Sequence, residues 1–186
     1  DSGLAIQEFM VFPKFDTFTQ NLQAGAEIFH QLKKILTQRN LSVGVGDEGG
    51  FAPRIATVAE TLDTLCEAVE KCGYKLGNEI EFALDAAASE FLNTDIYTVD
   101  NKPYKAAELT QFYQTLVEKY PITSIEDSHG EDDFTGFQNM QKNLGKKVQL
   151  VGDDLFVTNK KRLLIGIEQK LANAILIKVN QIGSLS

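Results

Sequence analysis

The sequence predicts an α/β fold in which parallel β-strands alternate with α-helices. From residue 80 onward, short apolar segments alternate with segments of helical periodicity, and this pattern is typical of parallel strands joined by helical crossovers. Near-continuous apolar segments such as AILI at 174–177 fit burial on both faces of a sheet. Four of the expected strands have a charged residue at the carboxyl end or directly next to it. Since the carboxyl ends of parallel strands share one edge of a sheet, we expect these charges to gather there.

Two amphipathic helices are expected before the alternation starts. Residues from about 19 to 37 place apolar side chains at steps of three and four, which predicts the first helix. Thr57 and Glu60 have the spacing of a capping box at the start of the second helix, and Gly73 is placed to end it. The stretch between the helices, LSVGVGDEGGFAP at 41–53, is dense in glycine and predicts a loop.

The alternating segments that follow leave two architectures open. One is an open doubly wound sheet, and the other is part of a (βα)8 barrel, which usually needs ~250 residues. The chain has 186 residues, so a barrel would be incomplete. The expected strands are 80–86, 122–126, 148–152 and 174–178, and the expected helices are about 106–119, 133–144 and 159–170.

The charged residues at the strand ends are three acids and one amine, namely Asp85, Glu126, Asp153 and Lys178. A single acid after a strand usually caps the next helix. Three in succession favour a bound cation, because gathered carboxylates repel one another. Only hard oxygen ligands are on offer, and these suit Mg²⁺. The sequence therefore predicts a magnesium site beside an amine.

Lys178 has an apolar strand behind it and carboxylates at the ends of the neighbouring strands. Burial lowers the pKa of a lysine and nearby carboxylates raise it, so a lysine balanced by a cation can act as a general base near neutral pH. The alternative is a structural salt bridge between Lys178 and one of the acids. We interpret Asp127 and Asp154, which directly follow two of the strand-end acids, as supporting or capping groups.

Three further residues are weaker candidates. Glu48 lies between glycines in the loop 41–53, where it either approaches a ligand or belongs to a solvated turn. Glu8 stands in the strand-like opening segment 4–13, and because burying an acid is costly it either faces a ligand or points outward. His129 lies near the strand ends but has no second histidine close in sequence, so it is a weak metal candidate.

The composition excludes several partners and compartments. The hydrophobic fraction of 43% is sufficient for a sizeable core, and the net charge of −8 with scattered basic residues argues against nucleic acid and anionic membranes. Cys66 and Cys72 have a spacing that suits neither a disulfide nor a metal site, which predicts reduced thiols and a cytoplasmic protein. No apolar run approaches the ~20 residues of a membrane span.

Four motifs resemble those of the enolase family, in the family's order and with similar spacing: VGDEGGFAP, SIED, VGDDLFVTN and LIKVNQIG. With QEFM and ALDAAASEF the resemblance extends over essentially all 186 residues. The strings VGDEGG and KVNQIG are specific to enolase itself within its wider superfamily of acid-sugar dehydratases and racemases. The resemblance implies a glycolytic lyase that dehydrates 2-phosphoglycerate to phosphoenolpyruvate with Mg²⁺ in the cytoplasm, and it leaves a secondary place at the cell surface open.

The resemblance also implies roles for particular residues. Lys178 would remove the C2 proton of the substrate, Glu48 would help to expel the C3 hydroxyl, and Glu8 matches a further active-site acid. All three would contact the substrate. The implied Mg²⁺ ligands are Asp85, Glu126 and Asp153.

The implied architecture is a TIM-type barrel of the enolase kind, present in part with about five strands and their helices. Residues 1–186 would be a partial C-terminal barrel domain without the family's N-terminal domain and last barrel strands. We expect the isolated chain to be inactive, because the family's main partners for the substrate phosphate lie outside it, and we expect the full-length protein to be a dimer or larger homo-oligomer. One departure is Ser128 and His129 in SIEDSHGEDDF, where the family has proline and an aromatic residue, which makes the shape of this loop an open question.

Two other functions remain as alternatives. The chain is a non-catalytic binding or scaffolding piece if the missing half of the site leaves it without activity. A receiver domain that accepts a phosphoryl group is the second alternative, with the pair Asp153 and Asp154 as acceptor and Lys178 beside it. Receivers place their paired acids at the first strand, whereas several strands precede the pair here.

Overall fold

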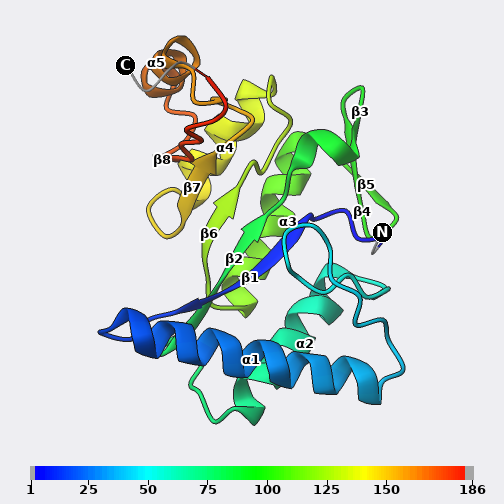
Figure 1. Ribbon diagram of the computed structural model, residues 1–186. Helices are drawn as coiled ribbons and strands as arrows, with labels where there is room; N and C mark the ends of the chain where they lie inside the picture. The colour runs from blue at the N-terminus through cyan, green and yellow to red at the C-terminus, as the bar shows by residue number, and fades with distance from the viewer. Residues whose placement is uncertain (1–2, 183–186) are drawn as a thin grey trace. The chain divides into compact units, whose positions relative to one another are not determined.

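The structure, a computed structural model, describes residues 3–182 (Figure 1). These residues form two compact units. Residues 3–4 and 8–83 belong to unit 1, and residues 5–7 and 84–182 belong to unit 2. Gly183, the last residue of the LIKVNQIG motif, lies outside the described range. No helix in the described part of the chain has the length and apolar character needed to cross a membrane.

Unit 1 contains the two predicted amphipathic helices, which pack side by side (Figure 1). Thr17 caps the first helix and Thr57 caps the second, each by accepting a hydrogen bond from a backbone N–H three residues later. Gly73 follows the second helix with φ of 83°, the left-handed conformation that glycine adopts without strain. The elements of unit 1 are β1 (Glu8–Pro13), α1 (Phe18–Gln38), α2 (Val58–Lys71) and the first four residues of β2 (Ile80–Asp85).

The glycine-dense segment between α1 and α2 is a loop, as predicted. A single antiparallel bridge joins Val45 to Phe51 across the turn that contains Glu48. The ring of Phe51 stacks on that of Phe29 from α1 at a centroid distance of 4.3 Å, which fastens the loop to the helix.

Unit 2 has the predicted alternation of strands and helices. The N–H of Ala86, directly after β2, donates to the carbonyl of Glu126 at 3.0 Å, so the end of β2 lies beside β6. From β6 onward the strands pair in chain order and in parallel, which confirms the α/β prediction. The elements are α3 (Ala106–Lys119), β6 (Ile122–Glu126), α4 (Phe134–Leu144), β7 (Gln149–Gly152), α5 (Lys160–Gln169) and β8 (Ala174–Ile175).

The last strand is shorter than predicted, because β8 ends at Ile175 and the expected strand ran to residue 178. The N–H of Leu176 still donates to the carbonyl of Gly152 at 3.1 Å. The N–H of Lys178 instead donates to Oγ1 of Thr158 at 3.0 Å. The chain therefore leaves the ladder for a loop contact, and Lys178 lies three residues beyond the strand.

A second small sheet in unit 2 was not predicted. It follows a 3₁₀ turn, η1 (Ala88–Phe91), and pairs three short antiparallel strands. Asp100 and Asn101 form the two-residue loop of its second hairpin, and both have positive φ, as a type I′ turn requires. The strands are β3 (Leu92–Asn93), β4 (Ile96–Val99) and β5 (Lys102–Tyr104).

The core of unit 2 includes a cluster of four buried side chains from α4 and the segments flanking α5: Phe137, Leu155, Phe156 and Leu171. Gly166 of α5 lies directly against this cluster. A Cβ at that position would come within 2.2 Å of the Phe156 ring, which is itself buried. Glycine at 166 is therefore required by close packing.

This packing predicts opposite effects for two glycine-to-alanine substitutions within helices. Gly166→Ala should destabilise the protein, because overpacking costs about 1–3 kcal/mol and exceeds the gain of at most about 1 kcal/mol in helix propensity. Gly25→Ala in α1 is the matched control, since a Cβ there meets nothing within 4 Å, and it should stabilise by about 0.5–1 kcal/mol. Unfolding free energies from chemical denaturation test this. A stabilising Gly166→Ala would contradict the close contact.

Candidate metal centre

The exits of four successive strands meet at one edge of unit 2. Residue pairing places Glu126 opposite Val151 on β7, and Gly152 opposite Ile175 on β8. The N–H of Asp127 extends the β6 and β7 pairing by donating to the carbonyl of Val151 at 3.0 Å. This register brings the residues that follow each strand to the same edge, as the alternating pattern predicted.

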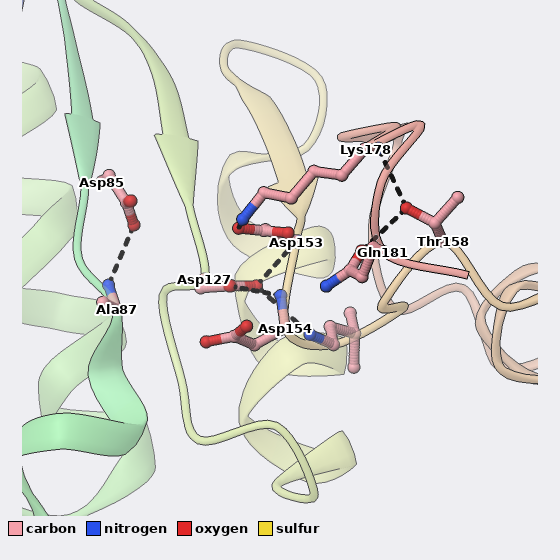
Figure 2. A network of polar contacts seen from close by, with 9 residues as sticks. Asp85, Ala87, Asp127, Asp153, Asp154, Thr158, Lys178 and Gln181 are labelled. Carbon is pink, nitrogen blue, oxygen red and sulfur yellow. Dashed lines mark hydrogen bonds and ion pairs between the residues drawn. The ribbon is translucent and has the colours of Figure 1, made fainter. Parts of the chain in front are cut away.

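Asp153 and Lys178 form an ion pair at this edge, with 2.5 Å between Nζ of Lys178 and Oδ2 of Asp153 (Figure 2). Asp153 is only 7% exposed, whereas the side chain of Lys178 is 42% exposed. The hydrogen bond to Asp153 raises the pKa of Lys178, burial opposes this, and the negative charges of Asp153, Asp154 and Glu126 add to the rise. The salt bridge that we considered as the alternative role of Lys178 is thus present.

The other oxygen of Asp153 is available to a ligand. Oδ1 of Asp153 is buried and has no hydrogen-bond partner among the described residues. A buried charged acceptor without a partner is costly, and a cation would remove that cost. The donor set at this edge therefore fits a hard divalent ion.

Asp127 accepts hydrogen bonds from three backbone N–H groups at this edge. Its carboxylate accepts hydrogen bonds from the N–H groups of Asp153 at 3.0 Å, Asp154 at 2.7 Å and Leu155 at 3.5 Å (Figure 2). Burial raises the pKa of Asp127 to about 6, although the bonds from the N–H groups of Asp154 and Asp153 oppose the rise. The sequence indicated a supporting group here but not which backbone groups it holds.

The acids closest to one another differ in part from the predicted ligand set. Oxygen atoms of Asp127, Asp153 and Asp154 lie within 4.8 Å of one another, so these three residues could hold a metal ion. Of the predicted ligands, Glu126 lies on the central strand and is close enough for its charge to act on Lys178. Asp85 ends β2, and its Oδ1 accepts a hydrogen bond from the N–H of Ala87 at 3.1 Å (Figure 2).

The two remaining predicted residues belong to unit 1. Glu8 is the first residue of β1 and is partly buried, and Glu48 is exposed in the turn of the glycine-rich loop. Their roles stay predictions.

Thr158 was missed by the sequence reasoning. Its Oγ1 accepts the hydrogen bond from the N–H of Lys178 and donates to Oε1 of Gln181 at 2.8 Å (Figure 2). Thr158 and the preceding Val157 both have positive φ, which is uncommon for β-branched residues. Such strain is often found at functional sites, but no residue pattern in the sequence predicts the positive φ of these two residues.

The geometry defines a class first: a parallel α/β protein with a carboxylate-rich site and an amine at the carboxyl ends of its strands. Comparison with known proteins then gives the family. Residues 1–186 match the family model described as "Enolase, C-terminal TIM barrel domain". The chain belongs to this family, so the part described here is a partial barrel of the TIM type.

The curated relatives include the enolase of Corynebacterium kroppenstedtii, to which the chain is 52% identical over 189 residues. The match covers 100% of this chain and 44% of that protein. The chain therefore spans less than half the length of this relative.

His129 is a core residue of unit 2, with 1% of its surface exposed. Its Nε2 lies 3.0 Å from the carbonyl oxygen of Ala106, and its Nδ1 lies 3.1 Å from Oγ of Ser128. Because a carbonyl only accepts, Nε2 carries the proton and Nδ1 accepts from the hydroxyl of Ser128. Both ring nitrogens are thus engaged, which removes the weak metal assignment. Three rings lie around the imidazole, those of Tyr97, Tyr113 and Phe137.

This burial predicts a pH-dependent contribution to stability. Burial lowers the pKa of His129, opposed by its bond to Ala106 and by the charge of Asp133, whereas an unfolded histidine titrates near ~6.5. The unfolded chain therefore binds the proton more readily, and this contribution is lost as the pH falls below about 6.5. His129→Phe should remove it, so the unfolding free energy of the variant should fall less steeply than that of the wild type between pH 7 and 5.

Denaturant unfolding of both proteins across this pH range gives the slope of the unfolding free energy against pH. Asp127 is present in both proteins, so its contribution cancels in the difference between the two slopes. The matched control is His30→Phe on α1, where the imidazole is exposed. Equal effects of the two substitutions on the slope would contradict the role of burial.

Proposed function

We propose that the protein containing this chain catalyses the Mg²⁺-dependent dehydration of 2-phosphoglycerate to phosphoenolpyruvate. The observation that carries the proposal is the contact between Lys178 and Asp153, with the second oxygen of Asp153 buried and unpartnered among the described residues. An amine and a carboxylate with a free oxygen are the groups that such a reaction needs side by side. Membership of the enolase family supports the same reaction.

The proposed Mg²⁺ ligands are the acids at the ends of β2, β6 and β7, namely Asp85, Glu126 and Asp153. Neighbouring strands lie about 5 Å apart, so these three acids stand in a row with Glu126 in the middle. When bound, the ion would neutralise the negative charge that develops on the substrate carboxylate.

Lys178 is the proposed general base. Its Nζ would take the proton from C2 of the substrate, and the electron pair left on carbon would move toward the substrate carboxylate. The base must be a free amine, and Asp153 opposes this while it holds the ammonium in an ion pair. Asp153 therefore has two proposed tasks, which are to bind the cation and to pair with Lys178. Lys178 becomes a base only when the negative charge of Asp153 is shared with a cation.

The second half of the reaction needs an acid near C3. We assign to Glu48 the protonation of the departing hydroxyl, which leaves as water while the electron pair on C2 forms the new double bond. Glu8 is the further active-site acid in contact with substrate. Both assignments rest on the position of these residues in the family's motifs.

We also propose that the whole protein is cytoplasmic and acts as a dimer or larger homo-oligomer, and that the 186 residues alone are inactive as a partial C-terminal barrel domain. Exposed apolar side chains after β8 support the last point, since Ile177 is 59% and Val179 is 81% exposed. Comparing the turnover and mass of the isolated chain with those of the full-length protein tests the proposed inactivity and the proposed oligomeric state. Full turnover by the isolated chain would overturn the proposed inactivity.

Lys178→Ala in the full-length protein should lower kcat by about 10²–10⁴-fold, the usual contribution of a general base. Lys161→Ala on α5, where the side chain is exposed, is the matched control and should leave kcat unchanged. Turnover of 2-phosphoglycerate is measured at saturating Mg²⁺, and removal of Mg²⁺ by a chelator should abolish it in all three proteins. Near-normal turnover by Lys178→Ala would exclude it as the base.

Glu48→Gln should separate the two halves of the reaction. Since Lys178 acts on C2 and Glu48 on C3, this variant should lose dehydration by about 10²-fold or more while it still exchanges the C2 hydrogen with deuterated solvent. Proton NMR of 2-phosphoglycerate follows the exchange, and Lys178→Ala should show none. Loss of exchange in Glu48→Gln would contradict this division of roles.

A further inference from the structure

The carboxylate of Asp127 is placed to orient the metal site. We propose that Asp127 is a positioning residue that aims the carboxylate of Asp153 at the cation and does not bind the cation itself. This inference rests on the proposed magnesium site. It goes beyond that site because it assigns to Asp127, which lies close to the proposed ligand Asp153, a role other than binding the ion.

The contacts of Asp127 leave little capacity for a metal. Oδ1 accepts from the N–H groups of Asp153 and Leu155, and Oδ2 accepts from the N–H of Asp154 at 2.7 Å. A carboxylate has about four lone pairs, of which three are in use here. If Asp127 turned toward an ion, these N–H groups would lose the only partner that the described residues give them, which is costly in a buried setting.

Asp153 has the complementary property. Its backbone N–H is held by Asp127, and its Oδ1 is buried without a partner in the described part of the chain. Asp153, which has an available oxygen, is thus held in place by Asp127, whose oxygens are occupied by hydrogen bonds. Partners of this kind, which hold a ligand from behind, are a usual component of metal sites.

The backbone of Asp127 connects the three strand exits that carry the proposed ligands. Its carbonyl accepts from the N–H of Ala88, just after β2, and its own N–H donates to Val151 on β7. Its φ is 41°, a left-handed conformation that aspartate adopts only at some cost. Bonds on both sides hold this conformation, which turns the side chain toward the segment after β7.

A second contact allows this role to be tested without unfolding the loop. Arg162 of α5 donates from Nε to the carbonyl of Leu155 at 2.7 Å and from Nη2 to the carbonyl of Glu131 at 2.9 Å. Arg162 therefore joins the segments after β6 and β7 independently of Asp127. Removing the Asp127 carboxylate should release the N–H groups of 153–155 while the loops stay in place.

The test uses Asp127→Asn in the full-length protein. Asparagine tolerates positive φ, so the substitution exchanges one acceptor oxygen for a donor without adding backbone strain. We expect direct titration with Mn²⁺ as probe to show binding weakened by about 10–100-fold, and the Mg²⁺ concentration for half-maximal activity to rise to a similar extent, with kcat at saturating Mg²⁺ largely retained. Asp95→Asn, an exposed acid between β3 and β4, is the matched control and should bind as the wild type does.

A second measurement separates positioning from direct ligation. In metal-free protein the amides of Asp153, Asp154 and Leu155 should be protected from hydrogen exchange in the wild type and should exchange about tenfold faster or more in Asp127→Asn. A direct ligand would instead relieve charge repulsion when it is removed from the metal-free protein, leaving these amides unchanged or slower.

The outcomes are distinct. Mn²⁺ affinity within twofold of the wild type in Asp127→Asn, or unprotected amides at 153–155 in the metal-free wild type, would overturn the proposal. The wild-type amide measurement can overturn the proposal even if the variant does not fold. A third outcome is that the wild type binds neither Mn²⁺ nor Mg²⁺ although these amides are protected. The proposed magnesium site then fails, and with it the proposal that Asp127 directs the Asp153 carboxylate to an ion. Only the hydrogen bonds from Asp127 to the backbone of 153–155 would then be supported.

Discussion

Hydrogen bonds between the exits of consecutive parallel strands are the constraint on which the candidate site of unit 2 depends. Each bond holds one exit against the next at the spacing of a sheet, roughly 5 Å. The strand-end acids cannot move apart without breaking this ladder, so their repulsion has to be offset in place. The bonds are Ala86 N–H to Glu126, Asp127 N–H to Val151 and Leu176 N–H to Gly152.

The ion pair at this edge does not by itself offset the repulsion. Lys178 is partly exposed, so its pair with Asp153 is screened by solvent and is worth at most about 1 kcal/mol in the manner of surface pairs. It also leaves one Asp153 oxygen buried without a partner among the described residues. The edge therefore has a surplus of negative charge that is held in place by backbone bonds and by the N–H groups around Asp127. A rigid surplus of this kind is suited to receive a cation, because little reorganisation is needed when the ion arrives.

Local patterns and distant contacts explain which parts could be predicted from the sequence. Strand 122–126 and helix 106–119 have the predicted bounds, because a short apolar run and a 3.6-residue stripe are local signals. The strand expected at 174–178 ends early because the N–H of Lys178 finds the hydroxyl of Thr158, twenty residues earlier. The hold of Asp127 on 153–155 likewise joins segments far apart in sequence, and it depends on a left-handed φ that composition does not reveal.

Ser128 and His129, where we expected a departure from the family pattern, belong to the core. Both residues are buried, and His129 uses its ring nitrogens for Ala106 and for Ser128 itself. Neither contacts a proposed ligand in these bonds, while Asp127, directly before them, keeps its backbone bonds to the segments on both sides. A buried polar pair at these positions is tolerated because each member satisfies the other and the adjacent helix end supplies the remaining acceptor. The loop thus accommodates Ser128 and His129 while the backbone bonds that hold the strand exits together are all formed.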